Sequence, residues 1–175
     1  MKLPVAHYFH RGRAGFTIIE TAMAIALTGI IGLGASVAFL QVSNQTSYNS
    51  DFTTASRQAM NAIHWLGQDV QMAQTVTGAD GFPATSDLEL SWKWWDNTVY
   101  SVNYTLENGS LRRSYSDGSN QQASLVAEYI SNDPDWTNCV SQNGTLTFTI
   151  TASVGEGVHT VNVTRTREVS ARPHL

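Results

Sequence analysis

Hydrophobic positions follow three successive patterns along this chain. Residues 16–40 are almost continuously apolar, residues 41–76 become amphipathic, and much of residues 77–175 alternates between apolar and polar. An apolar run of about 25 residues is long enough to cross the hydrocarbon core of a bilayer as a helix. Apolar spacings of three and four predict an amphipathic helix, and strict alternation predicts strands. The sequence therefore predicts a membrane anchor, an amphipathic helix and a β-rich globular part.

The anchor and the amphipathic segment are expected to form one helix, from about residue 16 to about residue 76. No proline interrupts residues 5–82, and Gly78 and Gly81 are suited to ending the helix. The amphipathic half carries one apolar stripe, made of Phe52, Ala55, Ala59, Ile63, Leu66, Val70 and Ala73. This stripe needs an apolar partner, which the following strands provide. The predicted fold class is α+β, one long N-terminal helix packed on a mostly antiparallel sheet.

Turn residues and alternation mark the strands of the globular part. Asn108-Gly109 separates two alternating runs and accepts the positive φ angles of a tight hairpin turn. A second clear run, residues 145–154, alternates apolar side chains with Thr and Ser. Both observations favour antiparallel pairing between strands that are neighbours in sequence.

Three tryptophans lie close together at the end of one predicted strand. Trp92 and Trp94 continue the face begun by Leu88 and Leu90, so we expect both to be buried. Trp95 falls on the opposite face. It is interpreted either as a sugar-stacking or subunit-contact residue or as an ordinary exposed aromatic.

The first residues form a basic leader that precedes the apolar run. Residues 1–15 contain Lys2, Arg11 and Arg13 and no acidic residue. A secretory signal carries its apolar block before the cleavage site, whereas here the block follows Gly15. Cleavage after Gly15 would remove the leader and leave the anchor in place, with Phe16 as the new N-terminus. The basic residues indicate that the N-terminus stays in the cytoplasm.

Glu20 is the only Asp, Glu, Lys or Arg between Arg13 and Asp51. A carboxylate within a membrane segment is costly and by default marks function. Because Glu20 lies one helical turn beyond Phe16, it is placed to pair with the free ammonium of Phe16 after cleavage, in the same chain or a neighbouring one. The alternative is that Glu20 only reaches the aqueous interface at the cytoplasmic end of the anchor.

The run Gly15-Phe16-Thr17-Ile18-Ile19-Glu20, followed by the apolar segment, resembles the N-terminal motif of type IV prepilins and of type II secretion pseudopilins. The resemblance implies that a prepilin peptidase cuts after Gly15 and methylates the amine of Phe16. It implies that Glu20 is the assembly glutamate, which neutralises the N-terminal charge of a neighbouring subunit. The implied fold is pilin-like. The implied partners are the peptidase, the cytoplasmic membrane, and other pilins or pseudopilins in a helical filament.

The resemblance also implies a location and a class of protein. The subunit would cross the cytoplasmic membrane once and then enter a periplasmic or extracellular filament, as a structural protein rather than an enzyme. Residues 104–113 are similar to a hairpin of J-type minor pseudopilins, and the anchor lacks the proline common in major pilins. These features favour a minor subunit, with pilus and secretion system both open. The alternative is a signal-anchored adhesin or sensor that never polymerises and uses the tryptophan-bearing sheet as its ligand face.

Composition and motifs bear on which ligands and covalent links the chain could have. Loss of the leader leaves seven basic and fourteen acidic residues, a net charge of −7, which argues against general nucleic-acid binding. Cys139 is the only cysteine, so it is expected to be a small buried apolar residue, with pairing to another chain as the alternative. No motif predicts a cofactor, a metal site or catalytic residues. Asn132, Asp133, Asp135 and Asn138 offer oxygen ligands for calcium, but a solvated loop is favoured.

Overall fold

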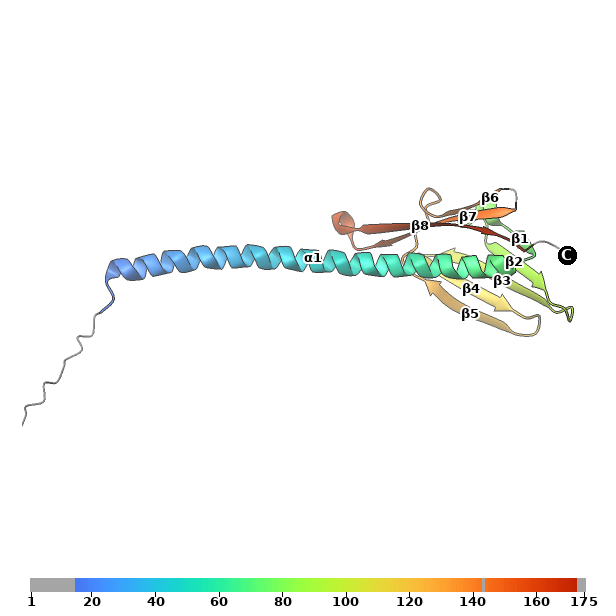
Figure 1. Cartoon of the computed structure of the whole chain (residues 1–175), viewed down its shortest axis with the longest axis horizontal. Coiled ribbons are helices and arrows are strands. Elements are labelled where there is room, and N and C mark those ends of the chain that lie inside the picture. Colours follow the sequence, from blue (N-terminus) through green and yellow to red (C-terminus); the bar gives the residue numbers. More distant parts are fainter. Residues whose placement is uncertain (1–14, 143, 173–175) are drawn as a thin grey trace, which may run out of the picture. The chain divides into compact units, whose positions relative to one another are not determined.

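The computed structural model describes residues 15–142 and 144–172, so the expected leader lies outside it except for Gly15. Within that range the fold is α+β, with one long helix and two antiparallel sheets (Figure 1). This confirms the predicted fold class. The chain divides into two compact units, one ending at Gln45 and the other beginning at Thr46, and α1 contributes to both.

Helix α1 comprises Ile18–Met72. Its end differs from the predicted position near residue 76, because the chain enters strand β1, Thr75–Thr77, directly afterwards. The Gln74 N–H donates to the carbonyl of Ser91 at 2.9 Å, and β1 pairs with β2 from Thr75 onward. Strand β1 consists only of β-branched residues, Thr75, Val76 and Thr77. Their side chains pack better on a pleated sheet than in a helix.

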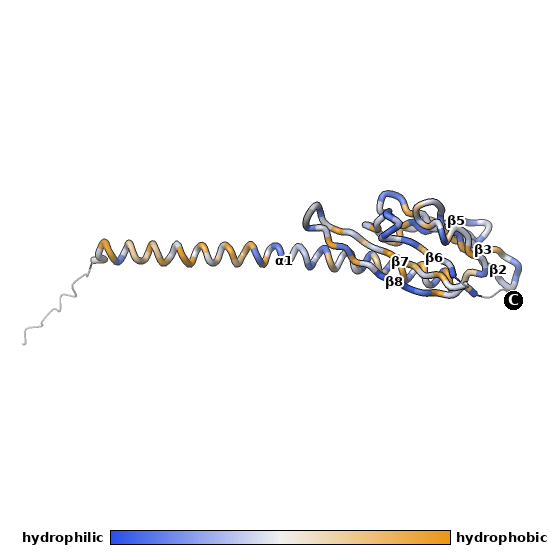
Figure 2. Tube along the Cα trace, turned by 90° about the horizontal axis from the view of Figure 1, so that it is seen from above, coloured by the Kyte–Doolittle hydropathy of each residue, from blue (hydrophilic) through white to orange (hydrophobic). Residues whose placement is uncertain are grey.

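The two halves of α1 differ in what surrounds them. From Ile18 to Gln45 every side chain is exposed, and this part carries the dense apolar colouring in Figure 2. The second half buries a stripe that begins at Ala55. Phe52, predicted to belong to that stripe, remains 46% exposed. The buried residues of α1 are Ala55, Ala59, Ala62, Ile63, Leu66, Gly67, Asp69 and Val70.

The first sheet has five strands in the order β1-β2-β3-β4-β5, each antiparallel to its neighbour. After β1 and a short 3-10 helix at Ala79–Gly81, the remaining strands are β2 (Leu88–Lys93), β3 (Val99–Glu107), β4 (Ser110–Ser116) and β5 (Gln121–Ala127). Asn108 and Gly109 alone connect β3 to β4. Their φ angles of 49° and 76° confirm the predicted hairpin turn.

A second sheet of three antiparallel strands has the order β6-β7-β8. Its strands are β6 (Asn138–Gln142), β7 (Thr145–Val154) and β8 (Val161–Ser170), with a 3-10 turn at Gly157–His159 between β7 and β8. The alternation in residues 145–154 predicted a strand, and β7 confirms it. Leu146, Phe148 and Ile150 lie on its buried face.

The second half of α1 contacts both sheets (Figure 1). Towards β8, the guanidinium of Arg165 donates to the hydroxyl of Ser56 at 3.2 Å. At Gly67 an added Cβ would lie 2.5 Å from the guanidinium of Arg167, so the absence of a side chain lets that arginine cross the helix closely. Buried side chains of α1, the first sheet and the second sheet form one apolar core.

A buried ion pair fixes α1 against the first sheet. The carboxylate of Asp69, 1% exposed, accepts two hydrogen bonds from Arg113 of β4: Nε to Oδ2 at 2.7 Å and Nη2 to Oδ1 at 3.0 Å. The hydroxyl of Tyr104 on β3 also donates to Oδ2. Burial and the Asp69 carboxylate raise the pKa of Tyr104, so its hydroxyl stays protonated as a donor. Trp65 covers the guanidinium of Arg113, whose Cζ lies 5.1 Å from the ring centroid.

Removing Arg113 is expected to destabilise the globular unit strongly. Arg113→Met leaves the Asp69 carboxylate buried without its cation, a loss of about 3 kcal/mol that corresponds to a fall in Tm of about 6–12 °C. Arg112→Met is the matched control, because Arg112 is the exposed neighbour on the same strand. Thermal unfolding of the full chain in detergent micelles, followed by tryptophan fluorescence, measures both. Equal Tm values for the two variants would contradict a stabilising role for the pair.

Candidate functional site

The predicted processing and assembly residues lie where the chain enters α1. Gly15, Phe16 and Thr17 precede the helix, and Glu20 lies in its first turn. All four are exposed, with 81% of Phe16 accessible. No hydrogen bond or ion pair joins the Glu20 carboxylate to another residue of the described chain. Gly15 and Phe16 are thus accessible as a cleavage site would require, and the carboxylate of Glu20 has no partner within residues 15–142 and 144–172.

Thr17 caps the start of α1, a feature that the sequence reasoning missed. Its hydroxyl accepts a hydrogen bond from the backbone N–H of Glu20 at 3.3 Å. Thr at the N-cap with Glu three residues later is the capping-box pattern, which is readable in the sequence. Glu20 therefore also has a local role, because a carboxylate in the first turn is stabilised by the positive end of the helix dipole. Any test of Glu20 must separate capping from charge.

The segment that follows presents apolar side chains outward. Within the described residues, α1 is the one helix long and apolar enough to cross a membrane, and the most apolar window of this helix is completely exposed within the chain. Ile18, Ile25, Ile31 and Phe39 are each more than two-thirds accessible. A continuous apolar surface of this size needs lipid or other protein around it.

Small side chains form a ridge along this exposed segment. Ala24, Thr28, Gly32 and Ser36 recur every four residues. The hydroxyls of Thr28 and Ser36 donate to the carbonyls of Ala24 and Gly32, so their polar atoms are satisfied within the helix. A Cβ added at Gly29, Gly32 or Gly34 would meet no atom within 4 Å. The folded chain itself therefore gives no steric reason for these glycines.

The second candidate site surrounds the tryptophans at the end of β2. Trp92 is 8% exposed, as predicted, and stacks on Tyr100 with ring centroids 5.9 Å apart. The prediction for Trp94 is wrong, because β2 ends at Lys93 and the side chain of Trp94 is 49% exposed. Trp95 is 86% exposed. The alternation of buried and exposed side chains holds only for the residues of β2 that pair with β3. The turn begins at Trp94, so this side chain does not continue the buried face of the strand.

That turn holds Trp95 in a defined position. The Trp94 N–H donates to the Thr98 carbonyl at 2.9 Å, and the Asn97 N–H donates to the Trp94 carbonyl at 3.0 Å. Asn97 has a φ of 67°, as expected for the last residue of a three-residue hairpin loop. The Asp96 carboxylate accepts the Thr98 N–H at 2.9 Å. Trp95 is thus exposed on a tight, internally hydrogen-bonded loop.

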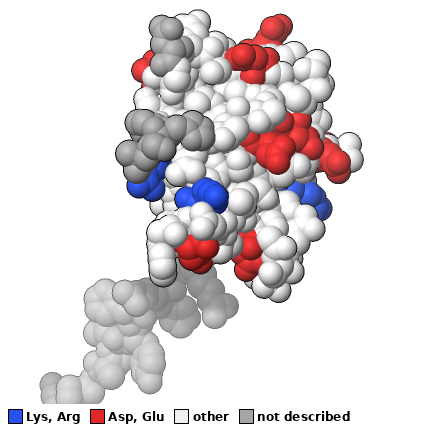
Figure 3. Space-filling model, turned by 90° about the vertical axis from the view of Figure 1, so that its right-hand side faces the viewer, with Lys and Arg blue, Asp and Glu red and all other residues white. Residues whose placement is uncertain are grey.

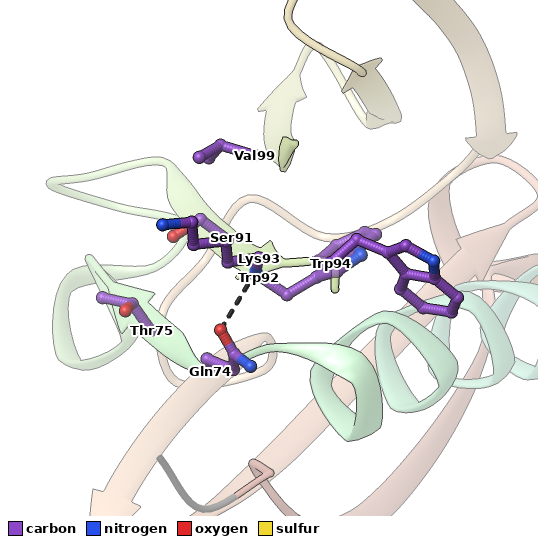
Figure 4. A pocket seen from close by; sticks show the side chains of 7 residues that line it. All are labelled: Gln74, Thr75, Ser91, Trp92, Lys93, Trp94 and Val99. Carbon is purple, nitrogen blue, oxygen red and sulfur yellow. Dashed lines mark hydrogen bonds between the residues drawn. The ribbon is translucent and has the colours of Figure 1, made fainter. Parts of the chain in front are cut away.

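Two adjoining hollows lie beside this turn and share Gln74, Lys93 and Trp94. The first has a volume of about 430 Å³ and also contacts Trp92, Ser91 and Val99. The second, of about 340 Å³, extends to Trp95 and Arg172. Figure 4 shows the first hollow, with the Gln74 Oε1 accepting the backbone N–H of Lys93 at 3.0 Å. We call the two hollows together the tryptophan groove.

Two cations flank the tryptophan groove. Lys93 and Arg172 are both exposed, and neither side chain has an ion pair with a carboxylate in the part of the chain that the structure describes. The Arg172 N–H donates to the Ala73 carbonyl at 2.9 Å, which fixes its backbone beside the end of α1. Figure 3 views the molecule from the right-hand side of Figure 1 and shows blue Lys and Arg atoms in small groups on a mainly white and red surface.

The loop considered for calcium is hydrogen-bonded to itself. The Asp133 carboxylate accepts the Asp135 N–H at 3.0 Å, and the Asn138 amide donates to the Pro134 carbonyl at 2.9 Å. Among the residues with described positions, no group of three or more His, Cys, Asp or Glu side chains is arranged to hold a metal. Cys139 is 2% exposed, which confirms that it is a small buried residue, and burial raises the pKa of its thiol to about 12.

Comparisons with known proteins add no relative to these observations. No protein-family model, no curated protein and no solved structure matches this chain. The chain thus combines a long N-terminal apolar helix with antiparallel sheets, an architecture compatible with that of a pilin, and any functional assignment depends on the residues themselves.

Proposed function

We propose that this chain is a structural subunit of a type IV pilus or a type II secretion pseudopilus. In this proposal a prepilin peptidase cuts after Gly15 and methylates Phe16, and residues 16–40 hold the subunit in the cytoplasmic membrane until a filament forms around them. The observation that carries the proposal is the placement of Gly15, Phe16 and Glu20 at the start of a helix whose first half buries no side chain.

The exposed anchor supports assembly through its helix. A helix of this length satisfies its own backbone groups, so its side chains alone decide what surrounds it. The ridge of small residues allows a neighbouring helix to approach closely. The glycines of the segment meet nothing within their own chain, which is expected if their contacts lie on another subunit.

Glu20 would provide the charge that selects the correct neighbour. In the apolar surroundings of packed anchors, an uncompensated carboxylate costs at least about 3 kcal/mol, and an ammonium group on the adjoining subunit removes much of that cost. The free amine that cleavage creates at Phe16 is such a group. Assembly would therefore depend on both the processing step and the Glu20 charge. A non-polymerising surface adhesin or sensor, the second candidate, requires neither.

Mass spectrometry of the N-terminal peptide tests the processing step. The protein isolated from its own host is expected to begin at Phe16 and to carry one added methyl group on its amine. A peptide that begins at Met1, from a host with an active prepilin peptidase, would contradict the proposal and favour the signal-anchored alternative.

Glu20→Gln tests the assembly charge while keeping the helix cap. Glutamine still fits the capping box, so α1 should start normally, but the ion pair with a neighbour is lost. We expect incorporation into filaments to fall by about tenfold or more, as a loss of at least about 1.4 kcal/mol implies. Immunoblots of sheared filaments against membranes measure the incorporated fraction.

Thr17→Val is the matched control for this variant. It removes the capping oxygen, which costs about 1 kcal/mol of local helix stability, and leaves the Glu20 charge in place. Incorporation is expected to stay close to that of the wild type. If Glu20→Gln, which keeps the cap, joined filaments as well as the wild type while Thr17→Val did not, the role of Glu20 would be capping alone.

Gly32→Leu tests whether the ridge of small residues contacts another helix. The isolated subunit should fold and insert normally, because the added side chain meets no atom of its own chain. Filament incorporation should fall severalfold, whereas Gly32→Ala should have a smaller effect. Ala26→Leu, about 120° around the helix from Gly32 and about 160° from Ala24 and Thr28, is the control for added bulk. Equal losses of filament incorporation from Gly32→Leu and Ala26→Leu would show that the ridge of small residues does not contact another helix.

A further inference from the structure

We infer that the tryptophan groove is a binding site for an acidic polysaccharide, a chain of sugar rings that carries carboxylate groups. The inference depends on the globular unit alone, so it holds whether or not the anchor assembles into a filament. Its basis is the combination of exposed indoles, polar groups and two cations without a carboxylate partner among the described residues, all around two adjoining hollows.

The indoles match one face of a sugar ring. A pyranose ring has an apolar face of C–H groups and a polar edge of hydroxyls, and a tryptophan ring offers a flat apolar surface of similar size. Trp94 and Trp95 are exposed, and Trp92, which also lines the first hollow, stacks on Tyr100. The hydrogen-bonded turn fixes the backbone on either side of Trp95, so binding loses little backbone entropy there.

Polar groups beside the indoles fit the hydroxyl edge of a sugar ring. Gln74, Thr75 and Ser91 contribute amide and hydroxyl groups along one side of the groove. The loop that presents Trp95 continues with Asp96, Asn97 and Thr98. The first hollow also contacts Val99 and Trp92, so its lining combines apolar and hydrogen-bonding groups, as the two sides of a sugar ring require.

The cations indicate that the ligand is acidic. Lys93 is the only lysine after residue 15, in a part of the chain with a net charge of −7. Lys93 and Arg172 both adjoin the second hollow and have no carboxylate partner among the described residues. Asp96, the acidic residue nearest to Lys93 in sequence, accepts the Thr98 N–H and lines neither hollow. Charge complementarity therefore favours carboxylates at regular intervals, as in a polymer of uronic acids.

The shape of the groove favours a polymer. The two hollows share Gln74, Lys93 and Trp94, so neighbouring rings of one chain would contact successive parts of the same surface. Trp94 lines both hollows. A ligand that spans both would contact each exposed indole and both cations.

The test uses an oligogalacturonate hexamer and its fully methyl-esterified form, which has the same rings without the negative charge. Binding to the full-length chain in detergent micelles is measured by titration calorimetry at low and high salt. We expect the acidic hexamer to bind, the neutral ester to bind more weakly by about fivefold or more, and added salt to reduce this difference.

Two variants, each with a matched control, locate the site. Trp95→Ala is expected to weaken binding of both hexamers by about tenfold, and Trp136→Ala, which removes another exposed indole, should change neither. Lys93→Gln should remove most of the preference for the acidic hexamer, and Arg57→Gln, at an exposed cation on α1, should leave it intact. Glu20→Gln should not affect binding, which keeps this test separate from that of filament assembly.

Three results would overturn the inference. They are no binding of the acidic hexamer at millimolar concentration, equal binding of the acid and its ester, and equal losses from Trp95→Ala and Trp136→Ala. A Trp95→Ala variant that fails to join filaments yet binds the hexamer normally would instead identify the groove as a contact between subunits.

Discussion

The globular unit depends on how α1 accommodates a buried carboxylate. Asp69 is a charged residue within an apolar helix face, and without its partners it would cost several kcal/mol. Arg113 and Tyr104 reach it from adjacent strands, so α1 is fixed in both rotation and register against the first sheet. Residues two apart on a helix point about 200° apart. Gly67, two residues earlier, therefore faces the other way and admits Arg167 of the second sheet. A single turn of α1 thus specifies the placement of both sheets.

Local patterns in the sequence predicted the elements of the fold well. The α+β class, the hairpin at Asn108-Gly109 and the buried stripe from Ala55 to Ala73 followed from periodicity and turn chemistry, because each depends on neighbouring residues. The errors in predicting the elements occurred where pairing with another segment determines where a helix or a strand ends. The helix ends early because β1 pairs with a strand more than ten residues away, and Trp94 is exposed because the ladder stops at Lys93.

The candidate sites were predictable to different degrees. Gly15, Phe16 and Glu20 form a linear motif, so the sequence alone was sufficient to select them. The capping role of Thr17 was also readable, through the spacing of Thr and Glu. The Asp69–Arg113 pair and the tryptophan groove were not, since they join residues from α1, β2, β4 and the chain after β8 that no local pattern relates. Prediction failed for features created by the tertiary fold.

The basic residues divide into those that stabilise the fold and those that lie exposed on the surface. After residue 15 the chain has seven basic residues. Arg113 neutralises Asp69, and Arg165 and Arg167 pack against α1, so these three serve the structure. Of the other four, Arg57, Arg112, Lys93 and Arg172, none has an ion pair with a carboxylate of the described residues, and Lys93 and Arg172 lie beside the tryptophan groove. In an acidic protein, two cations that have no carboxylate partner among the described residues and lie beside exposed indoles raise the local potential where an anion with an apolar face would bind.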